Sequence, residues 1–234
     1  MATQTPPYTI ITNTTIDNQP HVKFIRIRPN NFQLTLSEIF HSLIDKSWLK
    51  RFANPVIRKS FEARVDPTIA KITKNLQNGQ NTAVDSDSGE LVVSELSRKT
   101  VVNEFNYLDI PIAELFKCQV SQNPGFDFYS ENLDNVILFG EAKYLARTTA
   151  SRSALNQIDR FVSKEHKDEK DIPDLRDFIS KESIDKFGNG IKGFIAAFSS
   201  KKVSDDVIID RIKGYPSYNS LKKYAELICV AVDL

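Results

Sequence analysis

The stretch that decides the fold runs from Pro124 to Tyr144 and reads PGFDFYSENLDNVILFGEAKY. Its two apolar segments, GFDFY at 125–129 and NVILFGEAKY at 135–144, predict two strands, because aromatic and β-branched residues favour extended backbone. The polar residues 130–135 between them are typical of a turn. The stretch is therefore expected to form a β-hairpin.

Three charged residues in this hairpin form a predicted site. Pairing of the two strands would place Asp127 beside Glu141, and the alternation of side chains along a strand would point Glu141 and Lys143 to the same side. Carboxylate oxygens, with one backbone carbonyl, suit Mg²⁺ or Mn²⁺, which retains waters and accepts phosphate oxygens. Lys143 would orient a water molecule and stabilise developing negative charge.

An alternative interpretation is a solvated strand end with a surface Glu–Lys pair. The apolar run Val136–Phe139 argues against it, because a strand this apolar is typically buried on both faces. Charge placed at the end of such a strand has a desolvation cost that a functional site would explain.

Charge is unevenly distributed along the chain. Basic and acidic residues number 11 and 5 in residues 1–81, 3 and 11 in 82–142, and 17 and 14 in 143–234. An acidic centre between basic flanks is what a metal site facing a polyanion needs, since metal ions offset the acid and the flanks contact phosphates. Ordinary variation between segments is the alternative explanation.

The composition is that of a folded globular chain. Hydrophobic residues make up 41% and charged residues 26% of 234 residues, a length that suits one large domain or slightly more. Cys118 and Cys229 lie in apolar runs, which predicts buried thiols rather than a disulfide or zinc site. Residues 1–15 lack the pattern of a signal peptide, and no apolar run approaches about 18 residues. We therefore expect a cytoplasmic protein without a membrane segment.

Two regions are predicted. Residues 1–84 would form an N-terminal region for partner docking or DNA binding, which begins with a hairpin at 8–28. One helix would run from the capping pattern at Thr35 to Trp48. More helix would follow over 56–76, where Pro67 would end one helical segment. The polar segment 78–88 would link it to the main domain, 85–234. Further elements are expected there: a helix at 89–106, a strand at 110–120, helices at 151–163 and 168–185, and strands at 191–198 and 225–234. The predicted class is α/β, with helices flanking a mixed central sheet.

The hairpin motif resembles that of the PD-(D/E)XK nuclease superfamily. Asp127 follows Gly125-Phe126, and Glu141-Ala142-Lys143 begins fourteen residues later. GELVVSEL at 89–96 resembles the acidic first helix of that fold, and residues 156–161 resemble its Q-x-x-x-Y helix, with Phe161 in place of Tyr. Pro124 lies two residues further from Asp127 than in a strict motif. The resemblance covers roughly residues 89–200 and implies a restriction-endonuclease-like fold.

The resemblance also implies an activity and its residues. The chain would be a Mg²⁺- or Mn²⁺-dependent phosphodiesterase that cuts DNA, with Asp127 and Glu141 as metal ligands and Lys143 positioning water. The acid from the first helix would be Glu90 by motif or Glu95 by periodicity. Gln157 would contact a phosphate or support the ligands; a plain surface glutamine is the alternative.

A narrower resemblance is to the nuclease subunits of the Hachiman antiphage defence system, the DUF1837 family. It rests on similar size, a helix-rich N-terminal region and the run from GELVVSEL to GEAKY. It implies an effector of prokaryotic defence controlled by a partner helicase. Two alternatives stay open: a stand-alone type II restriction endonuclease, and a module on the same fold that binds nucleic acid or protein without cutting.

Overall fold

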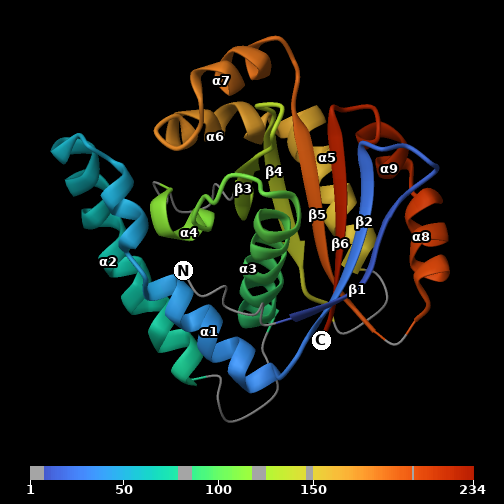
Figure 1. Ribbon diagram of the computed structural model, residues 1–234, viewed down its shortest axis with the longest axis horizontal. Helices are drawn as coiled ribbons and strands as arrows, with labels where there is room; N and C mark the ends of the chain where they lie inside the picture. The colour runs from blue at the N-terminus through green and yellow to red at the C-terminus, as the bar shows by residue number, and fades with distance from the viewer. Residues whose placement is uncertain (1–7, 79–85, 118–124, 146–149, 202) are drawn as a thin grey trace.

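A computed structural model describes residues 8–78, 86–117, 125–145, 150–201 and 203–234. The described chain forms an α/β fold around one six-stranded mixed sheet, as predicted from the sequence (Figure 1). The strand order is β1-β2-β6-β5-β4-β3. The strands are β1 (Tyr8–Thr15), β2 (Val22–Pro29), β3 (Phe128–Glu131), β4 (Ile137–Lys143), β5 (Gly193–Ser200) and β6 (Glu226–Asp233).

The sheet combines two antiparallel hairpins with a parallel centre. β1–β2 and β3–β4 are the predicted hairpins and form the two edges. Between them, β2, β6, β5 and β4 are parallel. In β4, Phe139 packs into one apolar layer and Leu138 into the other, so both faces of the strand are buried. Such burial explains the continuous apolar run before Glu141.

Helices cover both faces of the sheet. α3 (Ser86–Phe105) crosses one face beside α1 (Phe32–Ile44), and α5 (Ala150–Arg160) covers the other (Figure 1). The remaining helical segments are η1 (Ser47–Arg51), α2 (Pro55–Asn78), α4 (Ala113–Phe116), η3 (Phe161–Glu165), α6 (Lys167–Leu175), α7 (Lys181–Gly188), α8 (Asp205–Lys213) and α9 (Pro216–Leu221). Within the described ranges, no helix is both long and apolar enough to cross a membrane.

The predicted strand at 110–120 is wrong over its described part. Ala113–Phe116 is the short helix α4, and residues 118–120 lie outside the described ranges. The amide of Lys117 donates to the carbonyl of Ala113 at 2.9 Å, which closes the turn locally. A short apolar run carries no periodicity that separates a strand from a buried helical turn, so the sequence pattern fitted both.

Two predicted helix boundaries also differ. α1 begins after Asn31, whose side chain accepts a hydrogen bond from the Leu34 amide at 3.1 Å, so Thr35 lies inside the helix rather than capping it. Pro67 lies within α2 and does not end it. Ala63 and Pro67 are both exposed, so water can reach the carbonyl group that loses its amide partner.

The N-terminal hairpin belongs to the central sheet. β2 pairs with β6 from Val22–Leu227 to Ile27–Val232, and the Arg26 guanidinium donates to Asp233 at 2.9 Å and to Asp205 at 2.8 Å. The regions 1–84 and 85–234 therefore share one sheet.

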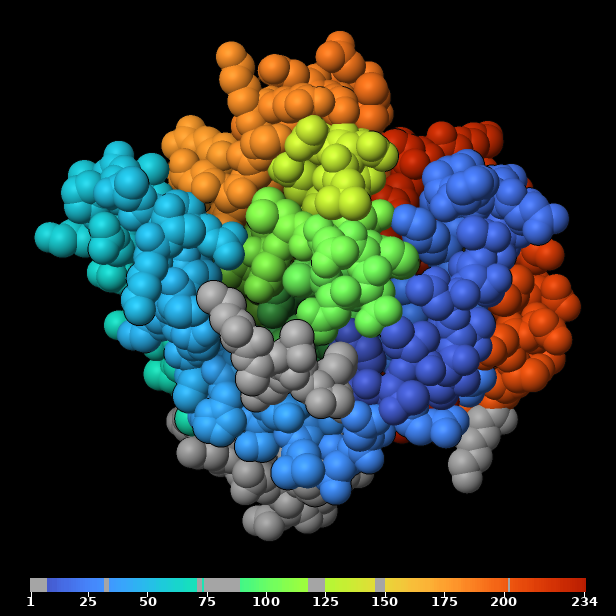
Figure 2. All heavy atoms as spheres, viewed as in Figure 1, coloured from blue at the N-terminus to red at the C-terminus, as the bar shows by residue number. Residues whose placement is uncertain are grey.

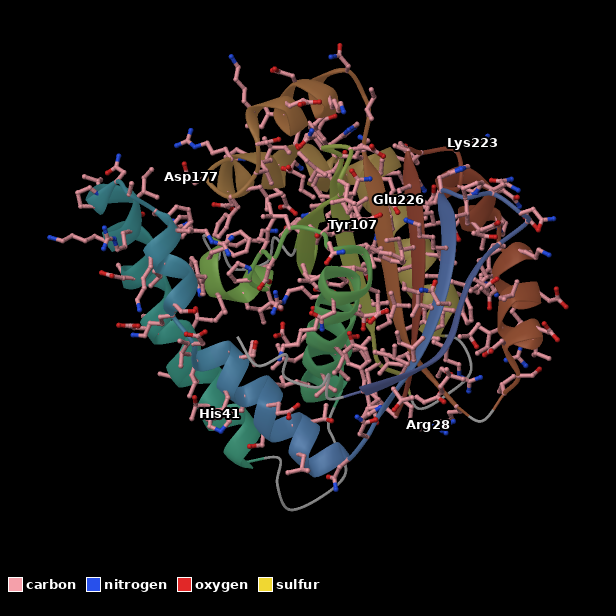
Figure 3. The ribbon with its side chains drawn as sticks, viewed as in Figure 1. Arg28, His41, Tyr107, Asp177, Lys223 and Glu226 are labelled. Atoms are coloured by element: carbon pink, nitrogen blue, oxygen red, sulfur yellow. The ribbon has the colours of Figure 1, made fainter. Side chains whose placement is uncertain are left out.

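The two ends of the parallel strands differ in their electrostatics. At the N-terminal end of β6, the buried Glu226 accepts hydrogen bonds from Tyr107 at 2.7 Å and Asn132 at 2.9 Å and pairs with Lys23 (Figure 3). Each oxygen of the Glu226 carboxylate therefore has at least one hydrogen-bond donor. The opposite end, where β4 reaches Lys143, carries carboxylates with fewer partners, and ligands of open α/β sheets typically bind at the carboxyl ends of strands.

Candidate active site

The β3–β4 hairpin fixes Asp127 against β4. The Asp127 amide donates to the Gly140 carbonyl at 2.9 Å, and one Asp127 carboxylate oxygen accepts a hydrogen bond from the Ala142 amide at 2.7 Å. A Cβ on residue 140 would lie 2.5 Å from the Phe128 ring, so glycine permits this close pairing. Asp127 is consequently held beside Glu141.

Lys143 joins two acidic side chains from different elements. Its ammonium nitrogen lies 3.0 Å from Glu141 Oε1 on β4 and 3.4 Å from both Oε atoms of Glu90 on α3. Any Cβ on Gly89 would overlap the Tyr144 ring, so this glycine lets the first turn of α3 approach the end of β4. The structure therefore gathers Asp127, Glu141, Lys143 and Glu90 from three elements.

Negative charge at this site is only partly compensated. Glu141 is fully buried, and neither of its oxygens has a hydrogen-bond partner within the described chain, despite the ion pair with Lys143. Burial, and then the charge of Asp127, raise the pKa of Glu141 well above its usual value. Burial also raises the pKa of Asp127 to about 6, against the hydrogen bond from Ala142. The nearby charge of Lys143 lowers both pKa values but does not outweigh burial.

Lys143 keeps its proton in this environment. Burial alone would lower the pKa of Lys143, but the charges of Glu141 and Asp127 outweigh it and raise the pKa above its ordinary value. An ammonium that holds its proton more tightly cannot serve as a general base near neutral pH. The side chain can instead orient a water molecule or stabilise a developing negative charge.

Sequence reasoning missed one more acid, Glu114. It lies in the first turn of α4, and the amide of the preceding Ala113 donates to the Asp127 carbonyl at 2.9 Å. Burial, and then the charge of Asp127, raise the pKa of Glu114 to about 8. In the sequence, Glu114 is the single acidic residue of the apolar run 110–116, and the strand predicted there gave it no role.

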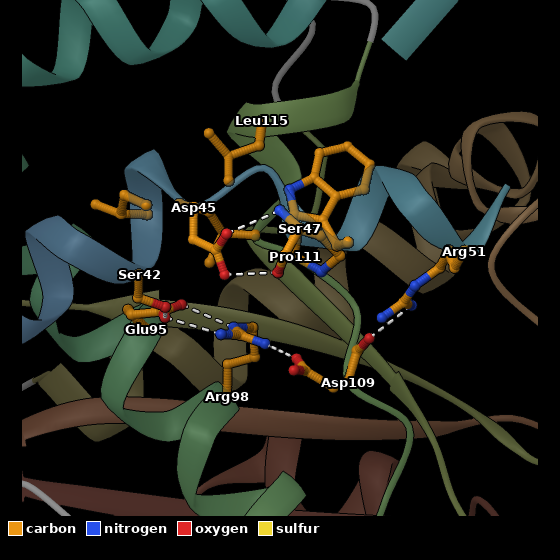
Figure 4. Close-up of a pocket in the computed structure, with 12 residues that line it drawn as sticks. Ser42, Asp45, Ser47, Arg51, Glu95, Arg98, Asp109, Pro111 and Leu115 are labelled. Atoms are coloured by element: carbon orange, nitrogen blue, oxygen red, sulfur yellow. Dashed lines mark hydrogen bonds and ion pairs between the residues drawn. The ribbon is translucent and has the colours of Figure 1, made fainter. Parts of the chain in front are cut away.

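Glu95 lies apart from this group. Its carboxylate accepts hydrogen bonds from Arg98 Nε at 2.7 Å and from Ser42 Oγ at 2.7 Å, and Arg98 also pairs with Asp109 (Figure 4). These residues line a cavity of about 300 Å³ between α1, η1, α3 and α4. Figure 2 shows the hollow between the light-blue N-terminal helices and the green segment of α3 and α4. Of the two predicted alternatives, the structure places Glu90 rather than Glu95 against Lys143.

Gln157 is half-buried on α5, on the face of the sheet opposite α3. It makes no hydrogen bond or ion pair with any residue that the structure describes. Its predicted contact with a phosphate therefore stays a prediction.

A separate polar network positions the strand that carries Asp127. Asp171 on α6 accepts hydrogen bonds from the Phe126 amide at 3.1 Å and from the Tyr129 hydroxyl at 2.6 Å, and Lys117 donates to it at 2.6 Å. Because these bonds flank Asp127 on both sides, they fix the backbone from which its side chain projects.

The donor set fits a hard divalent cation. Mg²⁺ usually takes one or two protein carboxylates and completes its octahedron with water and phosphate oxygens. Across the described ranges, no three His, Cys, Asp or Glu side chains converge closely enough to hold a metal ion without other ligands. Glu141 and Asp127 would supply the two carboxylates, and Glu141 Oε2 has no partner within the described chain.

Comparison with protein-family models and with curated proteins finds no match for the chain.

Proposed function

We propose that the chain is a metal-dependent phosphodiesterase that hydrolyses DNA, with Asp127 and Glu141 as the ligands of Mg²⁺ or Mn²⁺. The observation that carries the proposal is the buried Glu141 carboxylate, whose oxygens lack hydrogen-bond partners in the described chain while Asp127 and Lys143 adjoin it. Burying a charge in this way is costly unless a ligand compensates it.

The charged residues of the candidate active site would each have a role in this reaction. A water oxygen forms the new bond to phosphorus while the bond from phosphorus to the leaving sugar oxygen breaks, and the water proton ends on the released phosphate or hydroxyl group. Lys143 would orient the attacking water and offset charge on the phosphoryl oxygens. Glu90, 3.4 Å from the ammonium, would hold Lys143 in place. When bound, the cation would act as a Lewis acid on the phosphoryl group.

The test is cleavage of plasmid DNA by the purified full chain, with Mg²⁺, Mn²⁺ or EDTA. We expect EDTA to abolish cleavage and Glu141→Gln or Lys143→Met to reduce its rate by at least about 100-fold. Glu182→Gln on α7 is the matched control, because this acid is 60% exposed and pairs with Lys186 rather than with Lys143. Cleavage that survives EDTA or Glu141→Gln would contradict the proposal.

The same assay separates the two alternatives. Fragments of defined length would indicate a sequence-specific restriction endonuclease. Binding of DNA without cleavage under either cation would favour a non-cutting module, although Asp127, Glu141 and Lys143 are all present.

We extend the proposal to control by a partner helicase, on the resemblance of 89–96 and 140–144 to the Hachiman nuclease subunits. The test is affinity purification with a helicase encoded beside this chain, followed by the plasmid assay. Absence of a stable complex would remove this extension and leave the phosphodiesterase proposal intact.

A further inference from the structure

A small cavity lies at the end of the sheet that carries Lys143. This β5 cavity measures about 30 Å³ and is lined by the end of β5, the first turn of α5 and one side of α8. Phe198 of its lining is the register partner of Lys143 on β4, and Leu145, two residues beyond Lys143, lines it as well. A volume of this size admits about two water-sized groups, so it suits the oxygens of a small anion rather than a nucleobase.

The lining of the β5 cavity carries positive charge. Among the described residues that line it, two are basic, Lys201 and Arg211, and none is acidic. Both side chains are exposed and make no hydrogen bond or ion pair with any residue that the structure describes. Asp206 and Asp210 of α8 do not line the cavity. In the larger cavity beside Glu95, by contrast, three acids accompany two arginines, so the β5 cavity is the one that favours an anion.

Arg26 fixes the chain that carries Lys201. Its guanidinium donates to the Val203 carbonyl at 2.7 Å and to the Lys201 carbonyl at 3.3 Å. The same guanidinium pairs with Asp205 at 2.8 Å and with Asp233 at 2.9 Å, so it compensates both of these acids. The backbone at Lys201 is thus held in place without the use of the Lys201 ammonium.

Ser151 is an independent indication of a ligand. Only 7% of this residue is exposed, it lines the β5 cavity, and its hydroxyl has no hydrogen-bond partner in the described chain. A buried hydroxyl is unfavourable unless a partner satisfies it. Ser151 lies in the first turn of α5, which contains no acidic residue, and the amides and dipole at the N-terminus of a helix favour an anion. The hydroxyl, the helix end and the two cations therefore all favour an oxyanion in the same cavity.

We propose that the β5 cavity binds a phosphate group of the DNA, next to the phosphate that Lys143 contacts. This inference rests on the proposed function. Arg211 and Lys201 would pair with the nonbridging oxygens, and the Ser151 hydroxyl would donate to one of them. No bond forms or breaks there, so these are positioning residues, which would hold the strand so that the scissile phosphate lies beside Glu141 and Lys143.

The test is fluorescence anisotropy of a labelled DNA duplex titrated with the full chain, in EDTA and in Ca²⁺, at several NaCl concentrations. The slope of the logarithm of affinity against the logarithm of salt concentration counts the phosphates that a protein neutralises. We therefore expect Lys201→Met/Arg211→Met to reduce the magnitude of this slope by about 0.9 and to weaken binding at least about tenfold. Ser151→Ala removes a neutral donor and should weaken binding by about threefold without changing the slope.

Lys223→Met is the matched control. Lys223 is exposed and lies just before β6, at the opposite end of the sheet from Lys143, so its loss should change neither the slope nor the affinity (Figure 3). Circular dichroism confirms that each variant is folded.

The outcomes separate this inference from the proposed function. An unchanged slope and affinity in the double variant, with cleavage of plasmid DNA by the wild type, would overturn the phosphate site and leave the phosphodiesterase standing. Isothermal titration calorimetry with inorganic phosphate tests for a free anion: if the double variant binds this probe more weakly but binds DNA as the wild type does, the inference is also overturned. A wild type that neither binds nor cleaves DNA would overturn both proposals.

Discussion

At the scale of single residues, Glu141 shows a conflict between stability and function. A fully buried carboxylate that has one ion pair and no hydrogen bond within the described chain raises the free energy of the folded chain. Glu226 at the other end of the sheet is just as buried, but Tyr107, Asn132 and Lys23 compensate it. This contrast is what we expect if Glu226 has a structural role and Glu141 binds the proposed cation.

This contrast predicts that Glu141→Gln stabilises the metal-free protein. We expect the free energy of unfolding at pH 7.5 in EDTA to rise by about 1–2 kcal/mol, because the amide has no charge to desolvate. Urea denaturation measures it, and Glu182→Gln should stay within about 0.5 kcal/mol of the wild type. Saturating Mg²⁺ should narrow the difference, since the cation stabilises only the wild type. A loss of stability in EDTA would mean that the ion pair with Lys143 outweighs the desolvation cost.

The sequence predicted part of this site and missed part for physical reasons. The period of two along β4 correctly related Glu141 to Lys143, and the turn correctly opposed Asp127 to Glu141. It could not choose between Glu90 and Glu95, because the choice depends on where α3 crosses the sheet. The sequence did not reveal Glu114, because the position of α4 depends on a tertiary hydrogen bond from the Ala113 amide to the Asp127 carbonyl.

At the scale of elements, two of the acids on α3 have different environments. Glu90, the fifth residue of α3, lies 3.4 Å from Lys143, whereas Glu95 is paired with Arg98 and contacts Ser42 of α1. Burial alone would raise the pKa of Glu95, but Arg98 outweighs it and lowers the pKa below its ordinary value. The hydrogen bond from Ser42 to Glu95 thus links α1 to α3, and Arg98 offsets the buried charge of Glu95.

Removing Arg98 should therefore destabilise the protein in a pH-dependent way. Arg98→Met leaves the buried Glu95 charge with only the hydrogen bond from Ser42 and the longer ion pair with Lys99 at 3.8 Å, and we expect a loss of about 3 kcal/mol at pH 7. Without Arg98, burial raises the pKa of Glu95, so the folded variant binds a proton more tightly than the unfolded chain and its destabilisation shrinks as pH falls from 7 towards about 4.3. The wild-type contribution changes the opposite way, because a lowered pKa gives stability that is lost as pH falls.

Urea denaturation at pH 7 and pH 5 measures this difference. The double variant Glu95→Gln/Arg98→Met is the control and should recover at least half of the loss at pH 7, since no buried charge remains. An equal loss at both pH values would show that the hydrogen bond from Arg98 to the Ile110 carbonyl, rather than charge, carries the effect.

Elements with a long periodic pattern were predicted best. The N-terminal hairpin, β4, α3, α5, β5 and β6 lie close to their predicted ranges, because burial on one or both faces leaves a repeating apolar pattern. β3 (Phe128–Glu131) begins three residues later than the strand predicted at 125–129 and includes two residues of the predicted turn. The short helices α4, α8 and α9 have 4, 9 and 6 residues. Such segments are too short for a period of 3.6 to be distinct, and their conformation depends on what they pack against.

At the scale of the whole molecule, aromatic packing joins the two predicted regions. Phe61 of α2 lies 5.2 Å, ring centre to ring centre, from Phe178 after α6, and Trp48 of η1 lies 5.7 Å from the same ring. Phe116 of α4 is 4.7 Å from Phe178. Together with the pairing of β2 and β6, these contacts make residues 1–84 part of the core that supports the hairpin of the candidate active site.

The chain should accordingly unfold as one cooperative unit. Trp48, the single tryptophan of the sequence, reports on the contact between the regions, while far-ultraviolet circular dichroism reports on the whole chain. We expect both signals to change at the same urea concentration. Phe61→Ala should shift both midpoints downward together, with a loss of about 3–5 kcal/mol for a buried aromatic ring. A tryptophan transition that precedes the circular dichroism transition would instead show that residues 1–84 unfold on their own, and would make docking of a partner by this region independent of the sheet.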